Sequence, residues 1–327
     1  MNRRSIGRTG VAVTELGFGG APIGNLYSAV DEAAAAAAVH AAWDAGVRYF
    51  DTAPHYGLGL SERRLGRALA DRPRSEFVIS TKVGRLLDDN PAPTGSDLAA
   101  GGFAVPDTLT RRRDYSADGV CRSLEASLDR LGLDRIDIVL VHDPEDHMEQ
   151  ALGEAVPALV KLREQGVIGA VGVGVNHWQT PLPFVTGADI DVVMIAGRWT
   201  LADRTAAPLL AACAEHQVPV LAAAPFNSGL LASPWPAPGA FFDYNPAPAP
   251  VHELARALAA ACQRHQATLP HAAIQFPLRH RWVASVVAGI GTAGQARSDA
   301  GWATIPLPPA LWNCLDRIVP AGPENRS

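Results

Sequence analysis

Lysine is the residue that this sequence lacks most clearly. Of 28 basic residues only Lys82 and Lys161 are lysines, and the others are arginines. Lys161 belongs to the polar face of an amphipathic stretch, where a solvated charge is expected. Lys82 instead ends an apolar run. Because lysine is a compact charge with a tunable pKa, whereas arginine keeps its proton, Lys82 is a candidate for proton chemistry.

The chain also lacks the features of several protein classes. Its four cysteines form no CxxC pair or zinc-type spacing, which predicts reduced thiols in a cytoplasmic protein without a bound metal. No segment approaches the roughly 20 apolar residues of a membrane helix, and residues 1–5 contain no signal-peptide core. The formal net charge of −5 offers no basic surface to nucleic acid or an anionic membrane. We therefore expect a small molecule as the partner.

Short apolar runs alternate with longer amphipathic or alanine-rich segments along the chain. The predicted strands cover residues 16–20, 47–51, 77–82, 136–142, 169–175, 192–196, 218–224 and 283–288. The predicted helices cover residues 31–44, 61–70, 116–131, 148–165, 181–185, 206–216, 251–265, 270–278 and 294–303. About eight βα repeats predict an α/β fold, a (β/α)8 TIM barrel, as one domain over residues 1–327.

Three further segments complete this architecture. Residues 4–13 predict a β-hairpin around Thr9 and Gly10 that covers the bottom of the barrel. Residues 84–114 and 225–250 follow the third and seventh strands and are too long for simple turns. Long loops of this kind usually serve as lids or binding segments, so we expect both on the catalytic face.

Several predicted strands end in side chains that can carry or move a proton. Asp51, Lys82 and His142 each close an apolar run, and Tyr56 follows Asp51 by five positions. Because the carboxyl ends of barrel strands meet on one face, the four side chains should converge. A free phenol titrates at about 10, and an adjacent ammonium held by a carboxylate is expected to lower its pKa. Such a group suits moving a proton on or off an oxygen while a hydride moves.

Two other classes of protein use part of the same pattern. A barrel hydrolase would bind a metal through acidic and histidine side chains, for which the sequence offers Asp51, His55, His142, Asp143 and His147. Barrel hydrolases usually take paired histidines from the first strand, and residues 16–20 contain none. The other alternative is a nucleotide-binding subunit without catalysis, against which the intact group of four argues.

A family resemblance rests on four motifs. Residues 50–62, FDTAPHYGLGLSE, resemble the signature of the aldo-keto reductase superfamily, as do residues 81–82, 131–142 and the glycine-rich residues 172–176. The resemblance implies a (β/α)8 barrel that binds a nicotinamide cofactor across its C-terminal face. It places the catalytic tetrad on Asp51, Tyr56, Lys82 and His142, with Tyr56 as the general acid or base. Asn176 matches the residue that binds the nicotinamide carboxamide.

Other local phrases are similar to one branch of the superfamily. Residues 53–57, 196–201, 226–231 and 275–278 are similar to the aldose 1-dehydrogenases, a branch with L-fucose, D-threo-aldose and L-galactose dehydrogenases and pyridoxal 4-dehydrogenase. The resemblance implies oxidation of the C1 hemiacetal of an aldose to a lactone. Pyridoxal oxidation and general aldehyde or ketone reduction stay open as alternatives. His55 and Trp199 are assigned to the substrate, with a loop-carbonyl partner for His55 and simple packing for Trp199 as alternatives.

The resemblance also implies which residues contact the cofactor. These are Gly19, Asn176, Arg198, Asn227, Ser228, Gly229, Leu231, Gly289, Gly291, Thr292, Gln295 and Asp299. Relatives that bind NADP usually place basic residues after the eighth strand, whereas Gln295 and Asp299 stand where the family often has Arg and Asn. A carboxylate repels the 2′-phosphate and can accept a hydrogen bond from a free 2′-hydroxyl. We therefore predict NAD over NADP, provided that Arg297 does not turn inward.

Overall fold

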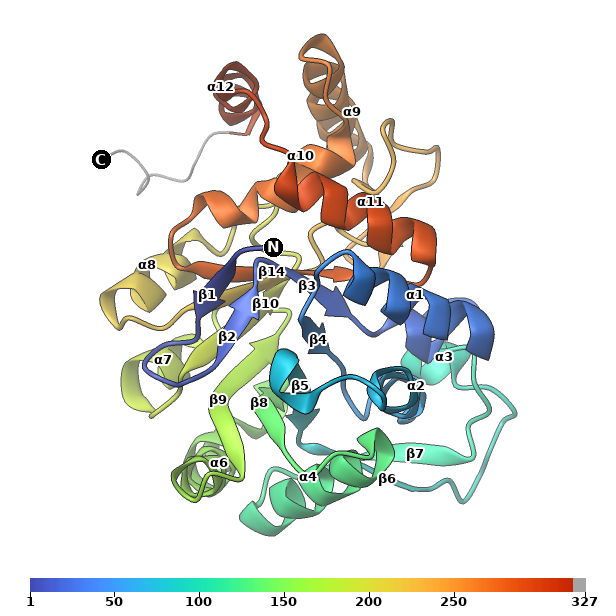
Figure 1. Cartoon of the computed structure of the whole chain (residues 1–327), viewed down its shortest axis with the longest axis vertical. Helices are drawn as coiled ribbons and strands as arrows, with labels where there is room; N and C mark the ends of the chain where they lie inside the picture. The colour runs from blue at the N-terminus through green and yellow to red at the C-terminus, as the bar shows by residue number, and fades with distance from the viewer. Residues whose placement is uncertain (320–327) are drawn as a thin grey trace.

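The computed structural model describes residues 1–319, and its centre is a closed barrel of eight parallel strands (Figure 1). The barrel strands are β3 (Leu16–Gly19), β4 (Tyr49–Asp51), β5 (Val78–Val83), β8 (Ile136–His142), β9 (Ile168–Val175), β10 (Val192–Ala196), β11 (Val220–Ala223) and β14 (Val283–Gly289). Around the barrel they pair in the order β10–β11–β14–β3–β4–β5–β8–β9, so barrel neighbours are also successive barrel strands in the chain. The predicted (β/α)8 barrel is confirmed.

Helices surround the strands (Figure 1). They are α1 (Glu32–Asp44), α2 (Leu60–Leu69), α3 (Leu98–Gly101), α4 (Ala117–Leu131), α5 (Met148–Gln150), α6 (Val156–Glu164), α7 (Leu182–Gly187), α8 (Ala207–Glu215), α9 (Ala249–Arg264), α10 (Leu269–Gln275), α11 (Ala293–Thr304) and α12 (Pro309–Ile318). Side-chain caps fix the starts of α1 and α4, among others: Asp31 accepts a hydrogen bond from the Ala34 amide (2.7 Å) and Ser116 accepts one from the Gly119 amide (3.0 Å). No helix within residues 1–319 is long and apolar enough to cross a membrane.

The helix predicted over residues 148–165 is interrupted. Residues 151–155 form a π-helical turn between α5 and α6. Pro157 lies just after this turn. Because proline has no amide hydrogen to donate to the carbonyl of Gly153, the regular hydrogen-bond pattern is broken here, and α6 begins with Pro157 in its first turn.

Side chains from the barrel strands and from the N-terminal hairpin fill the interior of the barrel. Buried side chains inside it include Tyr49, Ile138, Leu140, Met194 and Leu221. The antiparallel hairpin of β1 (Arg3–Ser5) and β2 (Ala12–Thr14) adds Ile6 and Val13 to the same cluster. This confirms the predicted hairpin at the barrel bottom, although its strands are joined through residues 6–11 rather than by a two-residue turn.

The two long connections contain regular structure that the sequence did not predict. Residues 84–114 include the antiparallel strands β6 (Arg85–Asp89) and β7 (Leu109–Arg113) as well as α3, and residues 225–250 include β12 (Phe241–Phe242) and β13 (Asn245–Pro246). The β6–β7 pair lacks alternating apolar residues and is joined by polar contacts such as Arg112 to Asp88 (2.6 Å). Helix α12, also unpredicted, buries Leu311 and Leu315 and packs on α9 at the top of Figure 1.

A buried acid connects the strand that carries Lys82 to two helices. Glu62 on α2 is fully buried. Its carboxylate accepts hydrogen bonds from Thr81 Oγ1 (2.7 Å) on β5 and from Arg130 Nε (2.6 Å) on α4. Because Thr81 directly precedes Lys82, this network fixes the end of β5 at the catalytic face.

Replacement of this acid should destabilise the barrel strongly. We expect Glu62→Ala to lower the free energy of unfolding by about 3–5 kcal/mol, because it leaves the Arg130 guanidinium buried without its partner. Urea denaturation measures the change. Asp118→Ala, which removes a carboxylate that is 80% exposed, is the matched control and should cost about 1 kcal/mol or less. Equal stability of the two variants would contradict the role of the network.

Candidate active site

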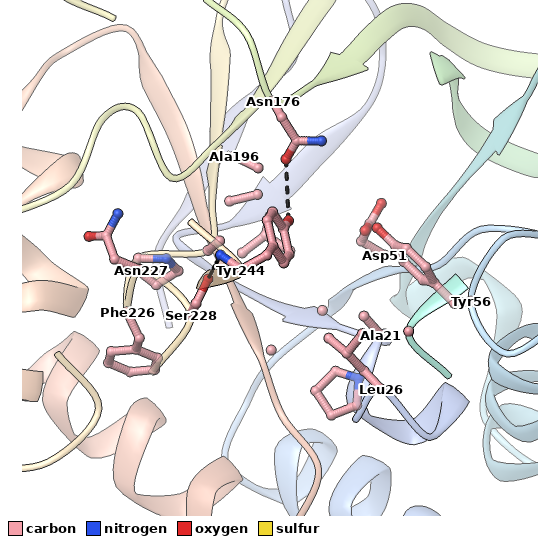
Figure 2. Close-up of a pocket in the computed structure, with 18 of the residues that line it drawn as sticks. Ala21, Leu26, Asp51, Tyr56, Asn176, Ala196, Phe226, Asn227, Ser228 and Tyr244 are labelled. Carbon is pink, nitrogen blue, oxygen red and sulfur yellow. Dashed lines mark hydrogen bonds between the residues drawn. The ribbon is translucent and has the colours of Figure 1, made fainter. Parts of the chain in front are cut away.

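One elongated cavity opens at the carboxyl ends of the barrel strands. Its volume is about 790 Å3. Asp51 and Tyr56 line one part of it, and Asp299 on α11 lines another. Asn176 and Tyr244 lie across the cavity from Tyr56 in Figure 2.

Lys82 and Asp51 form a buried ion pair in this cavity. The Lys82 ammonium contacts the two carboxylate oxygens of Asp51 at 2.8 and 3.0 Å and donates a further bond to the Thr52 carbonyl (2.9 Å). Burial alone would lower the pKa of Lys82, but Asp51 and Tyr56 raise it above its ordinary value. The ammonium therefore stays charged, 4.7 Å from the centre of the Tyr56 ring.

The pKa of Tyr56 departs from expectation. Burial raises it above the ordinary value and Asp51 raises it further, while Lys82 lowers it. The predicted net lowering of this pKa is therefore wrong, because desolvation of the phenolate outweighs the attraction of the ammonium. Tyr56 is a neutral hydrogen-bond donor at pH 7.

A tight loop between β4 and α2 presents the Tyr56 ring. The Tyr56 amide donates to the Ala53 carbonyl (3.0 Å), and the next residue, Gly57, has a φ of +62°. A Cβ on Gly57 would lie 2.1 Å from the carbonyl oxygen of Gly24. Only glycine fits at this position, which explains the Tyr-Gly pair in the signature motif.

His55 and His142 stand beside the phenol. The His142 ring centre lies 6.2 Å from that of Tyr56 and 5.8 Å from that of His55. Burial, together with Arg85 and other cations, lowers the pKa of His55 to about 2 and that of His142 well below its ordinary value. Both imidazoles are therefore neutral at pH 7, each with one donor and one acceptor nitrogen. The Nδ1 atoms of both are buried without a hydrogen-bond partner.

Most of the residues assigned to cofactor and substrate line the cavity. Those that do are Gly19, His55, Asn176, Asn227, Ser228, Gly229, Gly289, Gln295 and Asp299, together with Asp51, Tyr56, Lys82 and His142. Arg198, Trp199, Leu231, Gly291 and Thr292 do not line it. Arg198 lies in a small recess beside the cavity, where it pairs with Asp243 (2.6 Å).

Two apolar residues are placed differently from the prediction. The Trp199 ring is only 5% exposed and packs against Phe276 and His280, with 5.6 Å between ring centres in each pair. Leu231 is fully buried in the core outside the barrel. The position of Trp199 therefore favours the alternative in which it is a packing residue.

The start of α11 is closed by its own side chains. Gln295 Oε1 accepts hydrogen bonds from the Gly291 (2.9 Å) and Thr292 (3.1 Å) amides, and Thr292 Oγ1 accepts one from the Gln295 amide (3.1 Å). This capping box uses the backbone amides of Gly291 and Thr292, two residues that the resemblance assigns to the cofactor. Backbone amides at a helix N-terminus can bind an anion such as a phosphate, but here the Gln295 side chain accepts their hydrogen bonds.

Asp299 presents an unpartnered acid to the cavity. Its side chain is 3% exposed, and its Oδ2 atom has no hydrogen-bond partner among residues 1–319. Burial raises its pKa to about 7. Arg297 is exposed and does not line the cavity. It therefore does not turn inward toward the position of a 2′-phosphate, which was the condition placed on the prediction of NAD.

The β12–β13 segment reaches over the cavity. The Tyr244 hydroxyl donates to Asn176 Oδ1 (3.3 Å), and the Tyr244 amide donates to Ser228 Oγ (3.0 Å), as Figure 2 shows. Sequence reasoning did not assign Tyr244 a role in the site. It overlooked Arg85, which nothing distinguishes among so many arginines, and considered Asp143 only as a metal ligand.

Within residues 1–319, no three His, Cys, Asp or Glu side chains converge as a metal site would require.

Comparison with known proteins agrees with this geometry. The model of the aldo/keto reductase family matches residues 15–320. The chain is 46% identical to D-threo-aldose 1-dehydrogenase of a Pseudomonas species (95% of this chain, 96% of the relative) and 38% identical to pyridoxal 4-dehydrogenase of Microbacterium luteolum (96% of each). An aldo-keto reductase structure from Bacillus halodurans in its holo form superposes with a TM-score of 0.79 at 25% identity, covering 98% of this chain and 97% of that one. The chain belongs to the aldo/keto reductase family.

Proposed function

We propose that this protein is an aldose 1-dehydrogenase that oxidises the C1 hemiacetal of a sugar to a lactone with NAD. The observation that carries the proposal is the Lys82–Asp51 ion pair, buried beside Tyr56 in an open cavity. Such a pair stabilises the phenolate that hemiacetal oxidation needs. The 46% identity to a D-threo-aldose 1-dehydrogenase over nearly the whole chain supports a sugar as the substrate class.

Each catalytic side chain in the cavity has a separate role in the proposed chemical step. The C1–H bond breaks with transfer of hydride, for which a bound nicotinamide supplies the acceptor. The Tyr56 phenolate takes the proton of the C1 hydroxyl, and the C1–O bond becomes the lactone carbonyl. Lys82 stabilises the phenolate, and Asp51 holds Lys82 in place. Neutral His142 donates a hydrogen bond to the reacting oxygen.

The cavity fits a dinucleotide at both ends. Asn176 and Ser228 would hold the nicotinamide half near Tyr56, and Asp299 would face the adenosine half beside α11. The unpartnered Oδ2 of Asp299 supports this fit, because a buried carboxylate oxygen without a donor is costly unless a ligand supplies one. The four free thiols fit the cytoplasmic location that the sequence predicts.

A substrate panel tests the proposed reaction. We expect the wild-type enzyme with NAD to oxidise aldoses such as L-fucose to their lactones, and Tyr56→Phe to lower kcat by about 10²–10⁴-fold because it removes the base. Binding of reduced cofactor, followed by nicotinamide fluorescence, should be retained in the variant. Turnover of pyridoxal without turnover of any aldose would favour the alternative substrate, and unchanged turnover in Tyr56→Phe would remove the mechanism.

The direction of the reaction should determine its pH dependence. Because burial raises the pKa of Tyr56, the phenolate is the minor form near neutrality. As long as the pH lies below this pKa, each increase of one pH unit raises the phenolate fraction by up to tenfold. At saturating cofactor, we expect kcat/KM for aldose oxidation to rise steadily from pH 6 to pH 9. Aldehyde reduction, which uses the protonated phenol, should stay nearly constant over the same range. A flat profile for oxidation would contradict the assignment of Tyr56 as the base.

Cofactor preference should depend on Asp299 and on pH. We expect a higher kcat/KM with NAD than with NADP, and Asp299→Asn should reduce this preference by about tenfold because the amide does not repel a 2′-phosphate. Since the pKa of Asp299 is raised to about 7, the wild-type preference should strengthen as the pH rises from 6 to 8. Asp71→Asn, an exposed position distant in sequence, serves as the control. A clear NADP preference in the wild type would contradict the proposal.

A further inference from the structure

Backbone contacts hold Asp143 in place beside the catalytic residue His142. It directly follows His142 and has a φ of +42°, a left-handed conformation that is uncommon outside glycine, asparagine and aspartate. Its amide donates to the Gly174 carbonyl (3.0 Å), and its carbonyl accepts from Tyr115 Oη (2.9 Å) and Arg113 (2.7 Å). These backbone contacts fix the direction in which the side chain leaves the chain.

The carboxylate of Asp143 is anchored by an ion pair. Arg85, the first residue of β6, contacts Asp143 Oδ2 through its guanidinium, and the two side chains are only 12% and 16% exposed. Asn176 Nδ2 makes a longer contact with Asp143 Oδ1 (3.4 Å). An ionised carboxylate offers about four acceptor positions, so these two contacts leave acceptor capacity on the cavity side.

The other carboxylates that line the cavity serve different purposes. Asp51 is bound by Lys82 and by Ser80 (2.7 Å) beside Tyr56. Asp299 belongs to α11 at the other end of the cavity. Among the lining residues within 1–319, Asp143 is thus the carboxylate that stands beside His142 with free acceptor positions.

His142 and Asp143 lie close enough together to contact two neighbouring sugar oxygens at the same time. His142 Nε2 lies 3.5 Å from Asp143 Oδ2. Oxygens on adjacent carbons of a sugar are separated by about one hydrogen-bond length. If His142 donates to the oxygen on C1, the hydroxyl on C2 comes within reach of Asp143. A carboxylate is a strong acceptor for such a hydroxyl.

We propose that Asp143, oriented by Arg85, accepts a hydrogen bond from the C2 hydroxyl and selects aldoses that carry it. This inference rests on the proposed aldose dehydrogenase function. Asp143 contacts the substrate, whereas Arg85 is a positioning residue that acts through Asp143. A substrate without the hydroxyl leaves an acceptor position of the largely buried carboxylate unfilled, and a loss of this kind makes a polar site discriminate.

Kinetics on a matched pair of sugars tests this proposal. We measure kcat/KM for an aldose that the wild type oxidises and for its 2-deoxy analogue. We expect the wild type to favour the aldose by about 10–100-fold, as for hydrogen bonds to a charged group. Asp143→Asn, which tolerates the same backbone conformation, should reduce this ratio about tenfold, mainly by raising KM for the aldose. The 2-deoxy analogue should be affected much less.

Two further variants separate recognition from folding. Asp146→Asn removes an exposed carboxylate from the same loop and should leave the ratio unchanged. Arg85→Met with Asp143→Asn removes both partners, so that no buried charge is left unpaired, and should lose discrimination as Asp143→Asn does. An unchanged ratio in both Asp143 variants, or an equal loss on both sugars, would overturn the proposal while leaving the dehydrogenase function intact. A wild type that oxidises no aldose would overturn both.

Discussion

The ion pair between Lys82 and Asp51 is the interaction on which the active site depends. Both side chains are almost fully buried, and removing two charges from water costs several kcal/mol for each unless polar contacts replace the solvent. The barrel supplies those contacts from within: Ser80 donates to Asp51, and Tyr49, filling the barrel below, hydrogen-bonds to Ser80 (3.0 Å). The packing of the barrel interior and the charge of the active site are thus one connected structure.

The same ion pair determines the state of its neighbours. Burial is the main cause of the lowered pKa of His55 and His142, Arg85 lowers it further, and the Lys82 ammonium adds to the same effect. A neutral His142 can donate to a reacting oxygen without competing with Tyr56 as an acid. Burial keeps the phenol protonated while Lys82 opposes it, so the balance between desolvation and charge sets the proton affinity of Tyr56. A lysine is suited to this position because one compact ammonium reaches both Asp51 and the ring.

Sequence reasoning succeeded where a local pattern has one physical meaning. Apolar runs predicted the barrel strands, and their polar last residues predicted the convergence of Asp51, Lys82 and His142, because parallel strands leave no other arrangement. It failed where competing interactions decide the result. The pKa of Tyr56 depends on the depth of burial, and the amides near Gln295 are capped by that side chain rather than left free. The strands β6 and β7 pair through an antiparallel backbone ladder with an arginine–aspartate contact beside it, and apolar periodicity reports neither.

Within the part of the chain that the structure describes, three carboxylates line the cavity, and each has a different partner and a different role. Asp51 is neutralised by Lys82, so its charge supports proton transfer and is not offered to a ligand. Asp299 has no partner for one oxygen, so its charge acts directly on whatever lies beside α11. Asp143 has a cationic partner, as Asp51 does, because Arg85 fixes its direction. Like Asp299, it also keeps acceptor positions open to a ligand. Arg85 comes from the segment after β5 and not from the barrel itself. Substrate selection can therefore change with that segment while the buried pair and the strands that hold it stay the same.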